Sequence, residues 1–236
     1  MALGKKTGSL ILACSAAAAA AQFPARHLHA RGGCEGTLDV SAEGVAFAGP
    51  RGHAWQWKLD QIRQLELAPD RVVVLSYENG TLPWTQRKYE FAATVPAAEL
   101  YAVLGAHMDQ RLVAEFAPPA GGVLWSIPVK HVGRAGSRGE LEVAPETIRY
   151  RAAVKGESRT WRYKDVAGIS ISGPLQLTVT TFEHAPAHYG GRKDFNFELM
   201  QPIPEDRYNR LWLAIEMKNG RIPDQAPAAS GGAPAQ

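Results

Sequence analysis

The chain has 236 residues, of which 45% are hydrophobic and 21% are charged, a composition typical of a globular protein rather than a disordered or fibrous one. Lysine and arginine number 26 against 23 for aspartate and glutamate, and the sequence contains no stripe of basic residues. Composition and charge therefore exclude the usual footprint of a nucleic-acid-binding protein, and we expect no nucleic-acid partner.

The first predicted element in chain order is a secretory signal peptide at residues 1–21. A lysine pair precedes a short apolar run, and an alanine-rich tract ends in an Ala-x-Ala site before Gln22. The apolar run is too short to span a bilayer. An alternative is a lipoprotein signal, because Ile11-Leu12-Ala13-Cys14 resembles a lipobox with Cys14 as the lipidated residue. Both interpretations predict export, to the periplasm or to the outside of the cell.

The rest of the chain carries the same pattern twice. Residues 36–47 read Gly-x-Leu-x-Val-x-x-Glu-x-Val-x-Phe, and residues 139–150 read Gly-x-Leu-x-Val-x-x-Glu-x-Ile-x-Tyr. A second match aligns Trp55-Gln56-Trp57-Lys58 with Trp161-Arg162-Tyr163-Lys164, which sets Asp60 against Asp165 at a predicted turn. An internal repeat of this kind predicts two similar domains. Their predicted bounds are 23–111 and 123–222, with a linker at 112–122 and a disordered tail at 223–236.

Each copy predicts seven short strands and then one helix. Alternation of apolar and polar residues between Gly, Pro and Asp indicates strands. In the first copy these lie near residues 24–30, 36–41, 44–48, 53–59, 62–67, 71–77 and 87–93, and in the second near 124–132, 139–143, 147–152, 159–164, 167–171, 175–182 and 193–199. Pro96 and Pro204 suit the first turn of a helix, and apolar residues then recur at helical spacing.

The order of these motifs resembles the PH-like superfold in its bacterial and GRAM-type versions. The resemblance lies in the Gly-x-Leu-x-Val run, the Gly-Val-x-Phe that follows it, an aromatic strand ending at Asp60-x-Ile62, and Tyr89-x-Phe91 before a helix. It implies a mainly β fold of two tandem, partly open barrels, each of about seven strands closed by a C-terminal helix. Such scaffolds bind lipids, peptides or proteins and rarely catalyse reactions. We therefore expect a non-catalytic exported binding or scaffolding protein, with a protein or peptide partner in the cell envelope and no cofactor.

The first candidate site is a loop that occurs in both copies, with an aromatic residue shortly before two basic residues. The candidate residues are Trp84, Arg87 and Lys88 in the first copy and Tyr189, Arg192 and Lys193 in the second. An aromatic ring beside cations suits anionic lipid or an acidic partner, so peripheral attachment to a membrane surface is an alternative function. The competing interpretation is that these rings cover one end of the barrel.

The second candidate site is a metal site in the first copy. His27 and His29 alternate along a predicted strand and so share one face, and Cys34 follows nearby. Imidazole and thiolate both suit Zn²⁺. The second copy keeps His131 but has Ser137 in place of the cysteine, so a metal site shared by both copies is excluded and a candidate site is confined to the first copy. Two alternatives stay open, which are a thiol-dependent activity of Cys34 and a purely structural role for the strand histidine.

Overall fold

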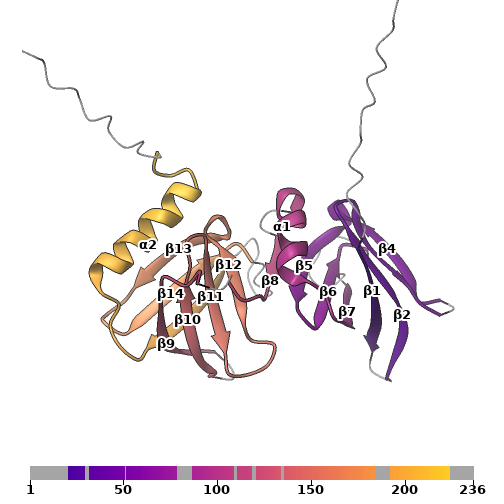
Figure 1. The fold of residues 1–236 in the computed structure, drawn as a ribbon, viewed down its shortest axis with the longest axis horizontal. Helices are drawn as coiled ribbons and strands as arrows, with labels where there is room; N and C mark the ends of the chain where they lie inside the picture. Colours follow the sequence, from indigo (N-terminus) through magenta and orange to yellow (C-terminus); the bar gives the residue numbers. More distant parts are fainter. Residues whose placement is uncertain are drawn as a thin grey trace, which may run out of the picture.

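The computed structural model describes residues 21–29, 32–50, 52–78, 87–108, 111–118, 121–133, 136–183 and 192–223. Within these ranges the chain is mainly β, with fifteen strands and two α-helices (Figure 1). The predicted mainly β class is therefore confirmed. None of the described helices is both long enough and apolar enough to cross a membrane.

The strands and helices fall into two sets with the same order, which we call the first and second units. The first unit contains β1 (Ala21–His29), β2 (Gly32–Ser41), β3 (Gly44–Ala48), β4 (Ala54–Lys58), β5 (Ile62–Ala68), β6 (Arg71–Ser76), β7 (Arg87–Ala93) and α1 (Ala97–Met108). The second contains β9 (Trp125–His131), β10 (Arg138–Val143), β11 (Thr147–Ala152), β12 (Arg159–Arg162), β13 (Val166–Ile171), β14 (Gln176–Thr181), β15 (Lys193–Leu199) and α2 (Glu205–Lys218). Every strand predicted from alternation is present.

Strand order is the same in both units. The first runs β5-β6-β7-β1-β2-β3-β4 and the second β13-β14-β15-β9-β10-β11-β12, with antiparallel pairing throughout. The two end strands of each unit do not pair with one another among the described residues, so each unit is an open, curled sheet. The first strand of each unit, β1 or β9, pairs on both sides and so holds a central position.

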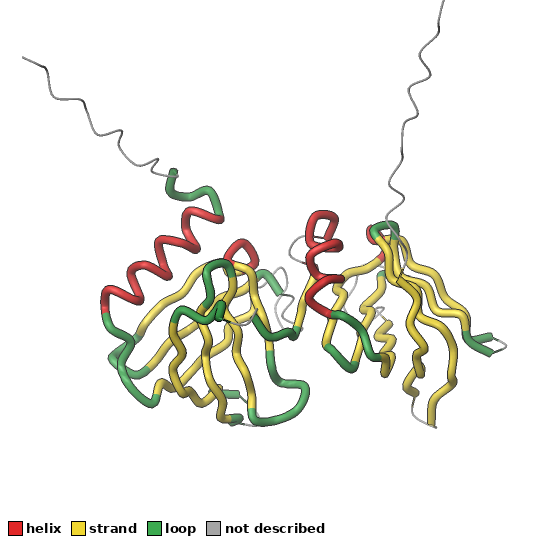
Figure 2. Tube along the Cα trace, viewed as in Figure 1, coloured by secondary structure: helices red, strands yellow, loops and turns green. Residues whose placement is uncertain are grey.

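One strand between the units was not predicted. β8 (Leu112–Ala114) lies in the expected linker, pairs in parallel with β5 and meets β12 where Ala114 faces Thr160. Figures 1 and 2 show β8 and α1 between the strands of the two units. The three residues are too few to show alternation, and all are buried, so the sequence pattern carries no strand signal there.

Each unit has its own hydrophobic core. Alternate residues of the strands point inward, and the largest fully buried rings are Trp57, Phe47 and Phe91 in the first unit and Tyr150 and Phe197 in the second. The helices cover these cores with their apolar faces, through residues such as Leu104 of α1 and Ile215 of α2, both of them fully buried. Burial of such side chains is the main favourable contribution to folding.

The repeated glycine at the start of the motif is explained by close strand packing. A Cβ atom at Gly36 would lie 2.3 Å from the Ala48 carbonyl oxygen, and one at Gly139 would lie 2.2 Å from the Arg151 carbonyl oxygen. Both are shorter than any normal contact, so only glycine fits where the neighbouring strand crosses. The repeated glycine is therefore explained by the requirements of the fold and does not indicate a shared function.

Strand register corrects one part of the alignment between the copies. Val45 pairs with Trp57 in the first unit, and Ile148 pairs with Trp161 in the second. Val45 and Ile148 occupy the same place in the two hairpins, so Trp57, and not Trp55, corresponds to Trp161. The structural alignment of the two tryptophan-rich segments therefore differs by two residues from the alignment based on matching letters. Identical letters two residues apart on a strand share a face, which explains why the sequence alone favours the wrong match.

A one-residue mismatch likewise separates Asp60 from Asp165. Short 3₁₀ helices cover Leu59–Gln61 and Tyr163–Asp165, so Asp165 corresponds to Gln61 rather than to Asp60. Asp165 is buried and accepts hydrogen bonds from the Tyr101 hydroxyl at 2.7 Å and from Arg162 Nε at 2.5 Å. It therefore holds α1 of the first unit against the second unit, a role that a simple turn residue does not have.

Candidate metal centre

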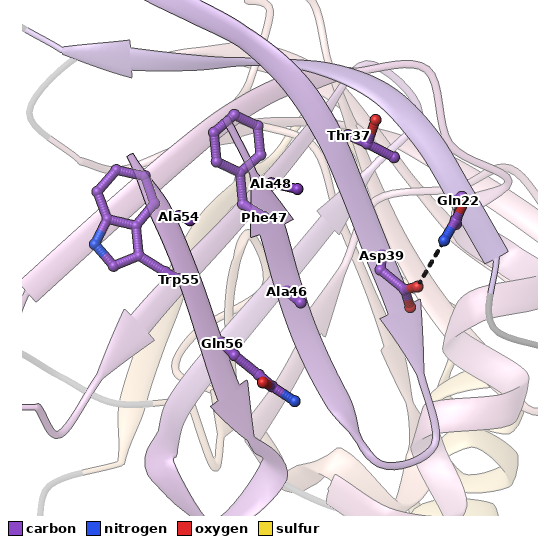
Figure 3. A pocket seen from close by; sticks show the side chains of 9 residues that line it. All are labelled: Gln22, Thr37, Asp39, Ala46, Phe47, Ala48, Ala54, Trp55 and Gln56. Carbon is purple, nitrogen blue, oxygen red and sulfur yellow. Dashed lines mark hydrogen bonds between the residues drawn. The ribbon is translucent and has the colours of Figure 1, made fainter. Parts of the chain in front are cut away.

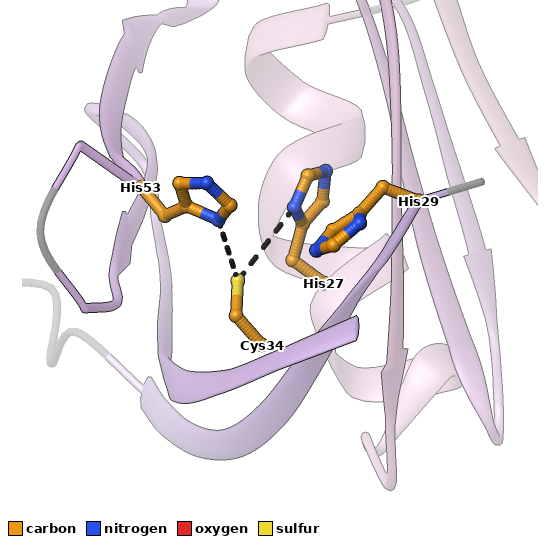
Figure 4. A group of neighbouring side chains, drawn as sticks. All are labelled: His27, His29, Cys34 and His53. Carbon is orange, nitrogen blue, oxygen red and sulfur yellow. Dashed lines mark hydrogen bonds between the residues drawn. The ribbon is translucent and has the colours of Figure 1, made fainter. Parts of the chain in front are cut away.

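Three strand segments bring four potential metal ligands together at one end of the first unit. His27 and His29 lie on the same side of β1, and Cys34 of β2 is the direct antiparallel partner of His27. His53 immediately precedes β4, and its ring lies 6.1 Å from the ring of His27 and 5.6 Å from the ring of Trp55, measured between centroids. Figure 4 shows the three imidazole rings gathered around the Cys34 sulfur.

The donor atoms are spaced for a single ion. Cys34 Sγ lies 2.9 Å from His53 Nδ1 and 3.8 Å from His27 Nδ1. One donor atom from each of the four residues can be chosen so that all lie within 4.8 Å of one another. In a tetrahedral site with metal–ligand bonds of about 2.0 to 2.3 Å, neighbouring donors are roughly 3.5 Å apart. The distance from Cys34 Sγ to His53 Nδ1 is shorter than this value and the distance to His27 Nδ1 is longer, so small movements of the side chains would suffice to bind an ion.

The four potential ligands differ in their exposure to solvent. The His27 side chain is buried at 8% exposure, Cys34 and His53 are partly buried, and His29 is exposed. An ion can therefore reach the sulfur and the outer imidazoles from solution, while His27 forms the inner wall.

Aromatic rings surround the buried side of the site. The His27 ring centroid lies 4.8 Å from that of Trp55, 5.3 Å from that of Phe91, and 6.1 Å from those of Phe47 and Tyr89. This packing fixes the ring of His27 in place before any ion arrives. Preorganised ligands lose less conformational entropy when they bind.

Burial lowers the pKa of His27, and the neighbouring rings of His29 and His53 lower it further. The pKa falls because a protonated imidazole would lose its hydration and would meet two other rings that can carry positive charge. His27 is therefore neutral at neutral pH, the form in which histidine binds metals.

The second unit has the corresponding histidine without the metal ligands. His131 ends β9 and packs against the rings of Tyr150, Phe195 and Phe197 at 5.4 to 5.8 Å. Ser137 stands opposite it, and the Ser137 hydroxyl forms a hydrogen bond with the Tyr150 hydroxyl at 2.7 Å. Burial lowers the pKa of His131 as well. The histidine thus has a packing role common to both units, and the thiol is peculiar to the first.

Sequence reasoning selected three of the four ligands and missed His53. The predicted strand at 53–59 begins at this residue, and His53, Trp55 and Trp57 alternate on one face. Because Trp57 belongs to the core, that alternation could have placed His53 on the inward side of the sheet. Its approach to Cys34, 19 residues earlier, depends on the register of three strands and is not visible in local spacing.

The aromatic and basic loops are described only in part. Trp84 and Tyr189 lie outside the described residues. Arg87 and Lys88 are exposed at the start of β7, and Lys88 forms an ion pair with Glu90 at 2.9 Å.

Basic residues of the second loop have partners within their own unit. Arg192 lies over the Phe182 ring at 5.3 Å. Lys193 forms an ion pair with the buried carboxylate of Glu183 at 3.3 Å and lies over the Phe195 ring at 4.6 Å. Lys193 therefore neutralises a buried charge of the second unit, which is a structural role.

A separate open groove of about 600 Å³ crosses β2, β3 and β4 (Figure 3). Small side chains form much of it, namely those of Ala46, Ala48 and Ala54. Its polar groups include Asp39, whose carboxylate accepts a hydrogen bond from Gln22 at 3.3 Å. The groove contains none of the four metal ligands, so it is distinct from the candidate metal centre.

The sequence matches no protein-family model and no curated protein. Among solved structures, it is similar to a chain of the Spt16D–Pob3N heterodimer, at 12% identity over 79% of this chain and 99% of that chain, with a TM-score of 0.32. It is also similar to the C-terminal domain of an unknown protein from Leishmania infantum, at 14% identity over 42% and 85% of the two chains and a TM-score of 0.28. A chain of the 8S snRNP assembly intermediate matches at 20% identity over 50% and 98%, with a TM-score of 0.31. Such scores assign neither a family nor a function.

Proposed function

We propose that this protein is a non-catalytic binding protein whose ligand is a transition-metal ion held by His27, His29, Cys34 and His53. The observation that carries the proposal is the convergence of one thiol and three imidazoles, with all four donors within 4.8 Å of one another. Imidazole and thiolate together bind borderline and soft metal ions and discriminate against Mg²⁺ and Ca²⁺, which prefer oxygen ligands.

The convergence is unlike an accidental group of surface side chains. The four residues come from β1, β2 and the start of β4, and the inner one is buried against aromatic rings. His27 and His29 lie on β1, and Cys34 on β2 pairs directly with His27. The closeness of these three ligands therefore follows from the register of the sheet. An ion in this position would tie the β1–β2 hairpin to the connection between β3 and β4.

Exposure of the site supports a binding or carrying role for an exchangeable ion. The outer ligands are accessible from solvent, because His29 is exposed and Cys34 is partly exposed. An ion that is reached from solvent can also be passed to another ligand. We propose no reaction for this site.

The metal-binding role fits within the broader proposal of an exported two-domain scaffold. The repeated seven-strand order with a following helix supports assignment of both units to the PH-like superfold. The signal-like segment at residues 1–21 supports export, in which case the ion is bound outside the cytoplasm. Membrane attachment through the loops is the weaker proposal, because Lys193 already has a buried partner.

The direct test is the metal content of the full chain, purified under reducing conditions without added metal. We expect close to one transition-metal ion per chain, removal of the ion by a strong chelator, and its return when the ion is added again. The double variant His27→Gln with Cys34→Ser should retain no ion. Retention of the ion by this variant, or no binding by the unmodified protein, would overturn the proposal.

The second unit provides a matched control. His131→Gln changes a histidine with the same position and the same kind of aromatic packing as His27. We expect this variant to bind as much metal as the unmodified protein. Equal loss of metal in His27→Gln and His131→Gln would mean that the loss reflects general damage to the fold.

A further inference from the structure

We infer that the ion held by His27, His29, Cys34 and His53 is copper in the Cu(I) state. This inference rests on the proposed metal-binding function and names the ion. It follows from three features of the site, which are the charge of the donor set, the apolar surroundings of its inner side, and the softness of the sulfur.

Charge is the first feature. The donor set contains one group that binds as an anion, the Cys34 thiolate, and three groups that bind as neutral imidazoles. A divalent ion would leave the complex with one net positive charge, whereas Cu(I) would make it neutral. Tetrahedral zinc sites of the Cys₂His₂ type reach neutrality with two thiolates, and this site has one.

On the inner side of the site, where His27 is buried, a net charge is costly. Rings of Trp55, Phe91, Phe47 and Tyr89 enclose His27 on its inner side, and the transfer of a charge into apolar surroundings costs free energy unless it is paired. Within the described part of the chain, the three imidazoles form no hydrogen bond with a carboxylate. Metal-binding histidines usually donate their second N–H to a carboxylate, a backbone carbonyl or a water molecule, and of these three only a carboxylate would add negative charge to the site.

The nearest acidic residue in sequence points away from the site. Glu35 follows Cys34 on β2 and therefore lies on the opposite face of the sheet, where it forms an exposed ion pair with Arg26 at 3.7 Å. Its side chain is 79% exposed, so water screens its charge from the cluster. The Cys34 thiolate is thus the one negative charge that the described residues place among the donors.

Ligand softness points the same way. Thiolate ligands select Cu(I) and Zn(II), and imidazole is a good ligand for both. Between these two ions the donor set is equally suitable, and the net charge of the complex decides. Copper(II) would bind more tightly than zinc to most nitrogen and oxygen sites, but it carries the same excess charge in this one.

The test is a competition between the two ions in the full chain. Protein with a reduced thiol is loaded with one equivalent of Zn(II) without oxygen, and Cu(I) is added as its bicinchoninate complex. We expect one Cu(I) per chain to displace the zinc, and a large excess of Zn(II) to leave the bound copper in place. If zinc is retained, the Cu(I) inference is wrong and the metal-binding function stands. If neither ion binds, both fail.

Variants locate the bound copper. Cys34→Ser removes the sulfur, and serine stands at the corresponding position of the second unit, so the substitution is compatible with this fold. We expect the Cu(I) affinity to fall by more than about 100-fold, since loss of groups that merely support a ligand costs about 10- to 100-fold. The His131→Gln control should keep the original affinity. An unchanged Cu(I) affinity in Cys34→Ser would overturn the inference, and far-ultraviolet circular dichroism confirms that each variant is folded.

Discussion

His53 is the residue whose role depends most on the three-dimensional structure. Its Nδ1 atom is 2.9 Å from Cys34 Sγ, compared with 3.8 Å for His27 Nδ1. We expect His53→Asn to lower the metal affinity at least about tenfold, measured with Cu(I) and with Zn(II). His107→Asn, at an exposed position near the end of α1, is the control. Equal affinities for the two variants would reduce the ligand set to the three residues that the sequence predicts.

His131 makes a prediction about stability and pH. Burial lowers its pKa in the folded protein, whereas in the unfolded chain its pKa is about 6.5. Below that pH the unfolded state binds a proton that the folded state does not, so the free energy of unfolding falls as the pH falls. We expect His131→Phe, which keeps an aromatic ring among Tyr150, Phe195 and Phe197, to weaken this dependence.

Urea unfolding of both proteins at several pH values between about 7 and 5 measures the effect. The unmodified protein should lose stability over this range with a steeper slope than the variant. Parallel slopes would mean that His131 does not bind its proton more weakly in the folded state, and the aromatic packing would then be compatible with a charged ring.

At the level of single residues, the sequence shows which side chains can bind a metal better than it shows which of them meet in the folded protein. His27, His29 and Cys34 could be grouped because they lie on neighbouring strands of one hairpin, where local spacing determines which residues meet. His53 could not be grouped with them, because its place depends on β3 and β4 following β2 with the correct register. The mismatch between Trp55 and Trp161 arises for the same reason.

The strands and helices themselves were largely predictable from the sequence. Alternation of apolar residues locates the fourteen strands of the two units because each strand has one face in a core. β1 and β2 begin earlier than predicted, at Ala21 and Gly32, because the backbone pairing of the hairpin extends from Ala21 opposite Val40 to His29 opposite Gly32. β8 carries no such pattern, since all three of its residues are buried.

Helix α1 is held to the second unit by a buried polar contact that can be tested. The Tyr101 hydroxyl donates to Asp165 at 2.7 Å, both residues are buried, and Arg162 lies over the Tyr101 ring at 4.5 Å. Burial, and then the Asp165 charge, raise the pKa of Tyr101 far above its ordinary value, so the hydroxyl stays protonated and donates. Tyr101→Phe should lower the free energy of unfolding by about 1 to 3 kcal/mol, because a buried carboxylate loses a donor.

Equilibrium urea unfolding measures this loss, with Tyr208→Phe as the matched change. The Tyr208 hydroxyl donates to the Ile169 carbonyl at 3.2 Å in a partly buried position, where water can replace the lost donor. The expected order is a larger loss for Tyr101→Phe than for Tyr208→Phe. The opposite order would show that Arg162 alone satisfies the Asp165 carboxylate.

For the whole molecule, the two units have separate cores and an asymmetric site. The sheet continues from one unit to the other through β8, and ion pairs such as Arg159 with Glu66 at 3.2 Å connect them. A metal ion in the first unit would be held by β1, β2 and the residue before β4, and none of its four ligands belongs to the second unit. Binding to the folded state alone stabilises that state by mass action, by about 2.7 kcal/mol at a free ion concentration of 100 times the dissociation constant.

This asymmetry predicts a local pattern of amide hydrogen exchange when the ion is added to the full chain. Exchange should slow in the strands that the ligands join, β1 to β4, because their local opening would require release of the ion. The corresponding strands β9 to β12 have the same pairing and the same order, and they serve as the internal control. Their exchange should change much less, since β8 joins the units through only a single paired position with β12. Equal slowing of both sets would mean that the two units open together. Slowing confined to β9 to β12 would place the ion in the second unit and contradict the proposed site.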